Sequence, residues 1–310
     1  MRIPAPRGEL SAALHDYLTD ADARWLGLPA VGGAGPEDSA IALWTLHELS
    51  YRGFDDVPDD MEWDPTLVAV RTRLEAALER SLRESFAASS AQTLAQLLEA
   101  DADAVGTADF VRRRATAEDV RDLLIQKSVY HLKESDPHFW VLPRLEPAPK
   151  AMLTELQYDE LGDGRPERVH AQLFADALAA AGLDPTYGAY VDVATTETLV
   201  LNNAISMLCL NRRLRHAAMG HLAAFEATSS LPSADWVRGL RRLGFDEAVV
   251  RYYDEHVEAD AVHEHLARAI CDQMIGDDPD LEREVGFGAF VCLELERRCT
   301  EAAVPSEAAA

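Results

Sequence analysis

The chain has 310 residues, of which 48% are hydrophobic, and a formal net charge of −25 at pH 7. This acidic excess argues against binding to nucleic-acid phosphates and against docking on an anionic membrane. A small-molecule substrate is the partner that this composition favours.

The first residues, MRIPAPRGELSAALHDYLTD, lack the apolar core of a signal peptide, and no uncharged apolar run reaches about 18 residues. We therefore expect a cytoplasmic protein without a membrane-spanning segment. The four cysteines contain no C-x2-C pair, so reduced core thiols are expected rather than a disulfide framework or a zinc site: Cys209, Cys271, Cys292 and Cys299.

Helical periodicity dominates the N-terminal region, over about 8–115. Apolar residues recur three and four positions apart in ALWTLHELSYRGFDD (42–56), and the same spacing continues in DPTLVAVRTRLEAALERSLRESFAA and SAQTLAQLLEADA. Residues 1–115 are thus predicted to form an N-terminal helical region. Three roles stay open for this region, which could cover the rest of the protein, form a homodimer contact or narrow the access of substrate.

The helical pattern restarts at Thr116, where Thr116 and Asp119 resemble a helix start, and it continues until Pro137. A Pro-rich link leads to a helix that begins near Ala151. The glycines of GDGRP then interrupt the pattern, and Pro166 is predicted to be the first residue of the next helix.

Further helices are predicted over about 195–228, 233–240, 244–274 and 279–299. Almost no period-two pattern occurs, so an all-α fold is expected. Residues 116–300 are assigned to a helical bundle and 301–310 to a disordered tail.

The segment YYDEHVEADAVHEH (252–265) combines acids and imidazoles with apolar residues at helical spacing. On a helical wheel of about 100° per residue, His256, Asp260 and His263 fall inside the apolar arc. A buried carboxylate needs a partner or a metal ion. The three residues could therefore bind a metal from one helix, or form a hydrogen-bonded core cluster, unless the buried face lies elsewhere.

Glu167 and His170 form an E-x2-H pair, which we expect on one face of the helix after GDGRP. Glu160 lies seven residues before Glu167 and shares that face only if helical geometry survives the glycines. Together with the residues of 252–265, these side chains suggest a metal centre built from several helices.

Glu226 lies on an apolar stripe formed by Leu208, Met219 and Leu222. The alternative to a metal ligand is a buried ion pair with Arg212 or Arg215. Glu134, near the end of YHLKES, is an accessory candidate ligand, and an ordinary surface acid is the simpler interpretation. A set rich in oxygen with some imidazole and no thiolate suits iron or manganese.

These residues and the segments around them resemble the heme-oxygenase-like di-iron oxidases, often labelled iron-containing redox enzymes. The resemblance spans about 40–270 and rests on HELSYRGF, EWDP, YHLKESDPHFW, LQYDELGDGRPERVH, LNRRLRHAAMGHLAAFE and YYDEHVEADAVHE. It implies a heme-oxygenase-like helical bundle, here with an N-terminal helical extension. It also implies two iron ions per chain, Fe(II) or Fe(III), without heme, held by Glu160, Glu167, His170, Glu226, His256, Asp260 and His263.

The function implied by the resemblance is that of a non-heme di-iron oxidase or oxygenase with O2 as co-substrate and an external electron donor. Its small-molecule substrate would undergo N-hydroxylation of an amine or guanidine, or C–H oxidation with desaturation or decarboxylation. The first alternative is a metal- or small-molecule-binding protein on the same bundle without oxygen chemistry. A second is an interaction module in which the polar groups are structural ion pairs and bind no metal.

Candidate substrate-binding residues are Arg215 and Tyr252. Arg215, like Arg212, could bind a substrate carboxylate, but both could equally pair with acids of neighbouring helices. Tyr130, Tyr158, Tyr252 and Tyr253 could line a cavity, although packing in the core with a satisfied hydroxyl is the simpler role.

Overall fold

The computed structural model describes residues 1–102, 104 and 106–304, without the side chains of 25, 26 and 258–262. Helices, turns and loops make up this described part, and no strand occurs in it. The all-α prediction is therefore confirmed. None of the helices in these residues has the length and apolar character needed to cross a membrane.

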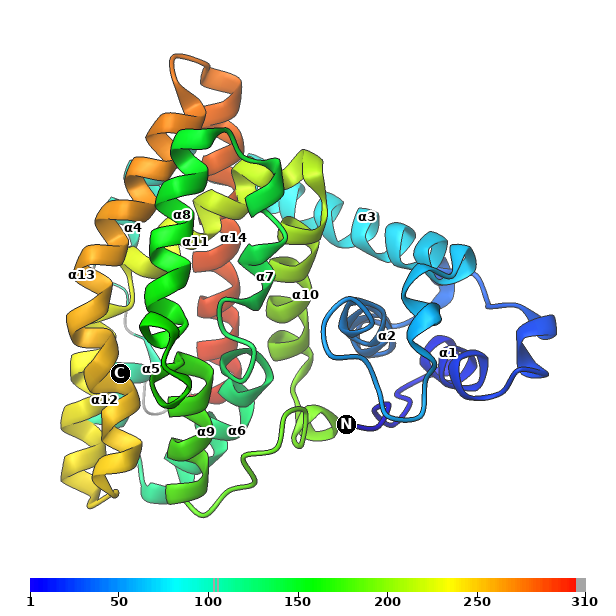
Figure 1. Ribbon diagram of the computed structural model, residues 1–310, viewed down its shortest axis with the longest axis horizontal. Helices are drawn as coiled ribbons and strands as arrows, with labels where there is room; N and C mark the ends of the chain where they lie inside the picture. The colour runs from blue at the N-terminus through cyan, green and yellow to red at the C-terminus, as the bar shows by residue number, and fades with distance from the viewer. Residues whose placement is uncertain (103, 105, 305–310) are drawn as a thin grey trace.

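Three N-terminal helices form a lobe beside the main bundle (Figure 1): α1 (Glu9–Thr19), α2 (Pro36–Glu48) and α3 (Pro65–Ala88). The carboxylate of Asp64 caps α3 by accepting hydrogen bonds from two backbone N–H groups of its first turn. Asp38 of α2 accepts hydrogen bonds from the backbone N–H groups of Leu10 and Ser11, at 2.9 and 2.8 Å. The side chain of one helix thus satisfies the N-terminus of another.

The remaining helices form the bundle: α4 (Leu94–Asp101), α5 (Thr107–Arg113), α6 (Ala117–His131), α7 (Asp136–Phe139), α8 (Pro147–Glu160), α9 (His170–Ala180), α10 (Thr196–Leu210), α11 (Arg215–Ala227), α12 (Ser230–Leu243), α13 (Glu247–Ile275) and α14 (Pro279–Ala303). Short 3-10 turns lie at Ala23–Leu26, Val31–Gly33, Asp59–Trp63, Leu142–Arg144, Gly162–Gly164, Pro166–Arg168, Val191–Val193 and Arg212–Leu214.

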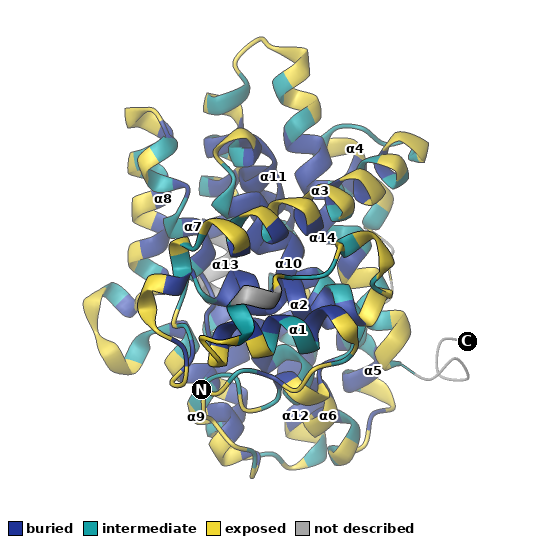
Figure 2. Cartoon of the chain, turned by 90° about the vertical axis from the view of Figure 1, so that its right-hand side faces the viewer, coloured by how far each residue is buried: buried dark blue, intermediate teal, exposed yellow. Residues whose placement is uncertain are grey.

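Two long helices organise the bundle (Figure 1). Helix α13 packs against α8, α9, α11 and α12, whereas α14 packs against α10 and α11. Helix α2 of the N-terminal lobe packs against α10. The buried residues concentrate in the middle of the bundle, around α10, α11 and α14 (Figure 2).

The apolar core continues across the expected boundary at residue 115. Leu82 and Phe86 of α3 and Leu97 of α4 belong to the same buried cluster as side chains of α10, α11 and α14. The division of the chain at this residue stays a prediction. Helix α14 continues through Ala303, and residues 305–310 of the expected tail lie outside the described residues.

Some predicted helix boundaries differ from those observed. Thr116 and Asp119 form the expected helix start, since each side chain bonds the backbone N–H of the other. That helix, however, ends at His131 rather than at Pro137. The predicted helix over 195–228 is interrupted between α10 and α11, and the helix expected from Ala151 begins four residues earlier, at Pro147.

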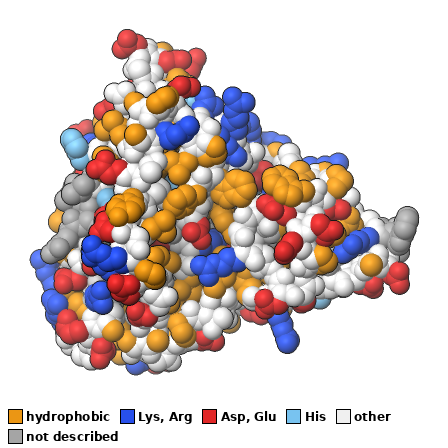
Figure 3. Space-filling view, in the orientation of Figure 1, with side chains coloured by type: hydrophobic (Ala, Val, Ile, Leu, Met, Phe, Trp, Pro, Cys, Tyr) orange, Lys and Arg blue, Asp and Glu red, His pale blue; other side chains and the backbone are white. Residues whose placement is uncertain are grey.

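Acidic and basic side chains are intermixed on the face shown in Figure 3. The acidic excess of the chain is therefore not gathered there into one patch of a single sign.

Helices α11 and α14 approach each other at glycines. A Cβ atom added at Gly220 would collide with the backbone oxygen of Val285, and one added at Gly288 would collide with that of Ala217. Because backbone atoms form both contacts, neither can be relieved by a change of rotamer. The two helices can pack at this distance only without side chains at these positions.

We predict that Gly220→Ala and Gly288→Ala each lower the free energy of unfolding by about 1–3 kcal/mol, because the added methyl group forces the helices apart. Gly32→Ala is the matched control, since a Cβ there would have no atom within 4 Å. Denaturant melts of the metal-free protein measure the effect. Equal stability of all three variants would contradict the close-packing argument.

Candidate metal centre

Six buried side chains form two adjacent groups of acidic residues and histidines. The first group contains Glu134, His170 and His256, and within it one potential ligand atom from each residue lies within 4.8 Å of the others. The second group contains Glu160, Glu226 and His263 and meets the same criterion. Both groups lie in the centre of the bundle.

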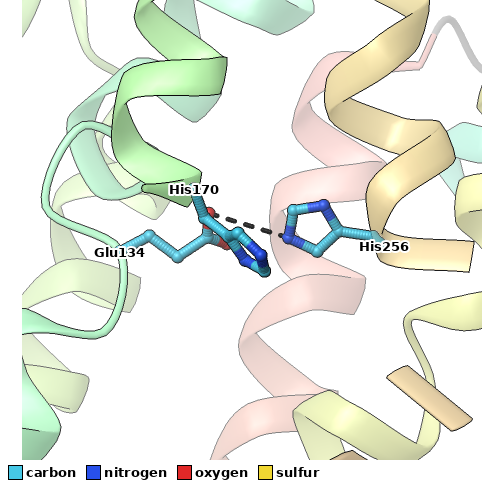
Figure 4. A group of neighbouring side chains, drawn as sticks. All are labelled: Glu134, His170 and His256. Atoms are coloured by element: carbon cyan, nitrogen blue, oxygen red, sulfur yellow. Dashed lines mark ion pairs between the residues drawn. The ribbon is translucent and has the colours of Figure 1, made fainter. Parts of the chain in front are cut away.

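Five separate segments supply these residues. Glu134 lies in the loop between α6 and α7, whereas Glu160 is the last residue of α8 and His170 the first of α9. Glu226 stands near the end of α11, and α13 provides the two remaining histidines, two turns apart. In Figure 4, Glu134, His170 and His256 point toward one another from three different elements.

Glu160 connects the two groups. Its Oε2 atom lies 3.1 Å from Nδ1 of His170, and its Oε1 atom lies 3.3 Å from Nδ1 of His263. Glu226 approaches the same His263 nitrogen at 3.6 Å. In the first group, Oε2 of Glu134 lies 3.8 Å from Nε2 of His256. Each oxygen of the Glu160 carboxylate therefore faces one group, as a bridging ligand requires.

Hydrogen bonds to the other ring nitrogens orient two of the imidazoles. Nδ1 of His256 lies 2.7 Å from the backbone oxygen of Tyr252, so this nitrogen carries the proton. Nε2 of His263 lies 2.7 Å from Oδ2 of Asp159. These contacts leave Nε2 of His256 and Nδ1 of His263 directed at the carboxylates, in the manner of metal-binding histidines held by outer partners.

The donor set fits a metal pair better than a set of hydrogen bonds. Nδ1 of His170 and Nδ1 of His263 are buried and make no well-aligned hydrogen bond, although each lies within ion-pair distance of an oxygen of Glu160. Leaving such atoms unsatisfied is costly, and a cation between nitrogen and oxygen removes that cost. Three carboxylates and three imidazoles without a thiolate suit iron or manganese.

The site strongly perturbs the pKa values of its members. Burial raises the pKa of the Glu226 carboxyl, and the neighbouring carboxylate of Glu160 adds to this rise. Burial also acts against ionisation of Glu160, but His170 and His263 outweigh it and hold its pKa well below the usual value. In the metal-free protein, bound protons therefore offset part of the negative charge of these carboxylates.

The pKa values of the three imidazoles are also shifted in opposite directions. Burial lowers the pKa of His170 and of His263, but the facing carboxylates outweigh it and raise these pKa values to about 9 and about 11. Burial dominates at His256, whose pKa is lowered. At neutral pH, His170 and His263 are therefore protonated, and His256 is neutral, when no metal is bound.

Hydrogen bonds to α13 and α8 fix the loop that carries Glu134. Its carboxylate accepts a hydrogen bond from the Tyr252 hydroxyl at 2.8 Å and lies 2.9 Å from Nδ1 of His131. Ser135 has a left-handed backbone, with φ of 74°, and its hydroxyl bonds the side chain of Gln157 on α8. This unusual conformation turns Glu134 into the bundle.

A buried ion pair ties the same loop to the N-terminal lobe. Nζ of Lys133 lies 3.2 Å from Oε2 of Glu48 on α2, and the two side chains are 2% and 0% exposed. The hydroxyl of Tyr187 donates to the same carboxylate, and Nζ lies 4.5 Å from the ring centre of Tyr51. The residue next to a candidate metal ligand is thus fixed by the N-terminal helices.

Glu134 is therefore a central member of the site, although its position suggested only an accessory role. Glu167 is not brought to either group. It is exposed in the 3-10 turn Pro166–Arg168, and the extended backbone of Val169, with ψ of 127°, separates that turn from α9. The prediction that Glu167 and His170 share a helical face is wrong, because no continuous helix joins them.

Asp260 belongs to the part of α13 whose side chains lie outside the described residues, so its role as a ligand stays a prediction. Tyr252 contacts the site through Glu134. Arg215 lies at the opposite end of α11 from Glu226, and its guanidinium donates to the backbone oxygen of Arg212. Tyr158 is 55% exposed. The structure therefore brings neither Arg215 nor Tyr158 to the metal centre.

Sequence reasoning missed Asp159, His131, Lys133 and Glu48. Asp159 is adjacent to the predicted ligand Glu160 in the DELGDGRP segment, and this position could have identified it as a partner of the site. The other three are recognisable only when residues far apart in the chain are brought together.

Comparisons with known proteins agree with this picture. The sequence pattern of the family described as iron-containing redox enzyme matches residues 121–297. A crystal structure of a CADD-like protein of unknown function from Nostoc punctiforme has a similar fold, with a TM-score of 0.51 and 15% sequence identity. The similarity covers 74% of this chain and 99% of that chain. Among curated proteins, none matches this chain.

We predict that metal binding releases protons, because imidazole must be neutral to coordinate. With pKa values of about 9 and about 11, His170 and His263 both lose a proton when Fe(II) binds at pH 7.5. Anaerobic calorimetry in buffers of different ionisation enthalpy should report release of about two protons per chain. Affinity should rise with pH from pH 6 and should still be rising at pH 9, because His263 has a pKa of about 11. Binding without proton release would contradict the assignment.

We predict that Glu48→Gln destabilises the protein by about 3–5 kcal/mol, since it leaves the buried Lys133 charge unpaired. It should also lower iron content by loosening Glu134. The double variant Glu48→Gln/Lys133→Met should recover part of both losses.

The control for this experiment is Glu247→Gln, because the Arg241–Glu247 pair is 51% and 72% exposed. Breaking it should have little effect on stability, because solvent screens an exposed pair. If Glu48→Gln behaved like Glu247→Gln in melts and in iron content, the N-terminal lobe would have no part in holding the site.

Proposed function

Because the chain belongs to the iron-containing redox enzyme family, we propose that it is a non-heme di-iron oxidase or oxygenase acting on a small molecule. The observation that carries this proposal is the Glu160 carboxylate, which faces His170 with one oxygen and His263 with the other. Two adjacent groups joined by one carboxylate are suited to two ions rather than one.

In this proposal, Glu134, His170 and His256 would hold one ion, Glu226 and His263 would hold the other, and Glu160 would offer one oxygen to each group. Asp260 remains a further proposed ligand from α13. When bound in the ferrous state, the iron pair would supply electrons for the reduction of O2. The three carboxylates offset the positive charge of the ions, and the hydrogen bonds from Asp159 and from the Tyr252 backbone keep the imidazoles oriented.

The surroundings of the site favour oxidation chemistry shielded from water. Leu156, Leu222 and Phe225 line the small void among the ligands, which measures only about 10 Å³. A porphyrin does not fit into this space, so the proposal is a centre without heme. These three apolar side chains would help to exclude water from the centre.

The reaction proposed is N-hydroxylation of an amine or guanidine, or C–H oxidation leading to desaturation or decarboxylation. When one oxygen atom of O2 enters the substrate and the other leaves as water, two electrons come from the substrate and two from elsewhere. An external electron donor is therefore part of the proposal for hydroxylation. The alternative is a protein that binds metal or a small molecule without turnover.

We expect protein loaded anaerobically with Fe(II) to hold about two irons per chain, to consume O2 on mixing and to develop a transient visible absorption. Retention of metal without any O2 uptake would instead support the binding protein. A protein that takes up no metal would favour structural ion pairs.

Two matched pairs of variants locate the ions. His263→Ala should lose iron, whereas His265→Ala, an exposed histidine on the same helix, should keep it. Glu160→Gln should lower the occupancy of both ions, whereas Glu167→Gln, in the exposed turn, should leave both in place. Iron content measured by metal analysis decides each comparison independently of activity.

A further inference from the structure

Three aromatic side chains form a continuous chain that begins at the metal centre. The hydroxyl of Tyr252 donates to Glu134 at 2.8 Å, and the ring centre of Tyr252 lies 4.5 Å from that of His256. Tyr252 thus touches two candidate ligands. The ring centre of Tyr253 lies 5.0 Å from that of Tyr252. The ring of Trp236 stacks on Tyr253, with 4.6 Å between ring centres and 2° between ring planes.

The chain leads from the centre of the bundle toward its edge. Tyr252, Tyr253 and Trp236 are all buried, and Trp236 belongs to α12, which packs against α13 at the edge of the bundle (Figure 1). Nζ of Lys127 lies 5.7 Å from the ring centre of Trp236. Lys127 also lines a cavity of about 550 Å³ between α6, α10 and the end of α14. One side chain therefore lies between the indole and a space that a small molecule can enter.

The residue types of the chain suit the transfer of single electrons. The phenol of tyrosine and the indole of tryptophan lose one electron far more readily than the phenyl ring of phenylalanine. Phe174, whose ring centre lies 4.9 Å from that of Tyr252, therefore offers no competing route. A phenol that is oxidised also releases its proton, and the Tyr252 hydroxyl already has an acceptor in Glu134. Tyr252 can thus be oxidised and reduced again in place.

Tyr253 differs from Tyr252 in its hydroxyl group, which is buried without a hydrogen-bond partner. No acceptor is in place for its proton, so this phenol is not a stable site for a radical. Its ring instead forms a bridge between Tyr252 and Trp236. An indole can lose an electron before it loses a proton, so Trp236 needs no such acceptor.

We propose that Tyr252, Tyr253 and Trp236 conduct single electrons to the metal centre, so that an oxidising equivalent formed without substrate is removed before it damages the ligands. This inference rests on the proposed function and adds a protective function to the same site. The electrons come from a small-molecule one-electron reductant, such as ascorbate, that approaches Trp236 from the surface.

The electrons and protons of this transfer balance. Tyr252 gives one electron to the oxidised centre, and its proton passes to the hydrogen-bonded pair of Glu134 and His131. Trp236 then gives one electron to Tyr252 across the ring of Tyr253, and the proton returns to the phenol. The reductant finally gives one electron to Trp236. Each oxidising equivalent therefore consumes one electron from the reductant.

Electron paramagnetic resonance of the full-length chain tests the proposal. The Fe(II)-loaded protein is mixed with O2 without substrate and frozen at increasing times. We expect an organic radical whose spectrum narrows when the protein carries ring-deuterated tryptophan. Trp236→Phe should lose this tryptophan radical, and a tyrosyl radical should persist severalfold longer in its place.

Trp44→Phe is the matched control for Trp236→Phe. Trp44 is also buried and also has a lysine near its ring, with Nζ of Lys133 at 5.5 Å, but its ring contact is with Phe54 rather than with a tyrosine. This variant should keep the wild-type radical.

Two substitutions of Tyr253 separate the ring from the hydroxyl group. Tyr253→Phe should keep the tryptophan radical, because the ring remains. It should also raise stability slightly, because it removes a buried hydroxyl without a partner. Tyr253→Leu should lose most of the tryptophan radical, because the bridge is removed. Iron content should be unchanged in both variants.

Oxidative damage is the second measurement, and it is independent of product formation. After repeated exposure to O2 with ascorbate, mass spectrometry should find severalfold more oxidation in the peptide that carries His256 in Trp236→Phe than in wild type or Trp44→Phe. Trp236→Phe preserves an aromatic ring in the core, so it decides the question if Tyr253→Leu does not fold.

O2 uptake without a tryptophan radical would overturn the proposal and leave the proposed function intact. The same holds if Trp236→Phe and Trp44→Phe gave equal radical signals and equal damage. Absence of O2 uptake by iron-loaded wild type would overturn both, because the chain would then have no oxidant to serve.

Discussion

The structure depends on the burial of three carboxylates and three imidazoles at the centre of one helical bundle. Charges removed from water must be compensated, and here Glu160 lies between two imidazoles. Glu226 approaches His263, and Glu134 approaches His256. Protons can compensate part of this charge in the metal-free protein, as the raised pKa values of His170 and His263 indicate. Metal ions compensate it more fully, because they also satisfy the unbonded ring nitrogens.

The same constraint explains the role of the N-terminal helices. Glu134 lies in a loop, and a loop residue holds a ligand position only if the surrounding structure fixes it. Helix α2 contributes Glu48, which pairs with the buried Lys133 beside that ligand. Residue 48 lies outside the segment that matches the family pattern, 121–297. Helix α2 therefore contacts the loop that carries Glu134.

Two spaces of different size lie next to each other in the bundle. The side chains proposed to hold iron fill a void of only about 10 Å³, whereas the adjacent cavity of about 550 Å³ offers room for an organic molecule. Tyr130 and His131 stand between the two spaces. His131 contacts both the cavity and Glu134, and Tyr130 lines both spaces, so these two side chains form the partition between them.

Local sequence pattern was sufficient for the all-α fold, for the helical register that buries His256 and His263, and for Glu226 on its apolar stripe, because periodicity within one helix depends on neighbouring residues alone. The tertiary structure decided the ligands from irregular segments. Glu167 is excluded by the extended backbone at Val169, whereas Glu134 is selected by the left-handed Ser135 and the distant Glu48. Contacts between residues far apart in the chain fix such loops, and these contacts leave no periodic signal.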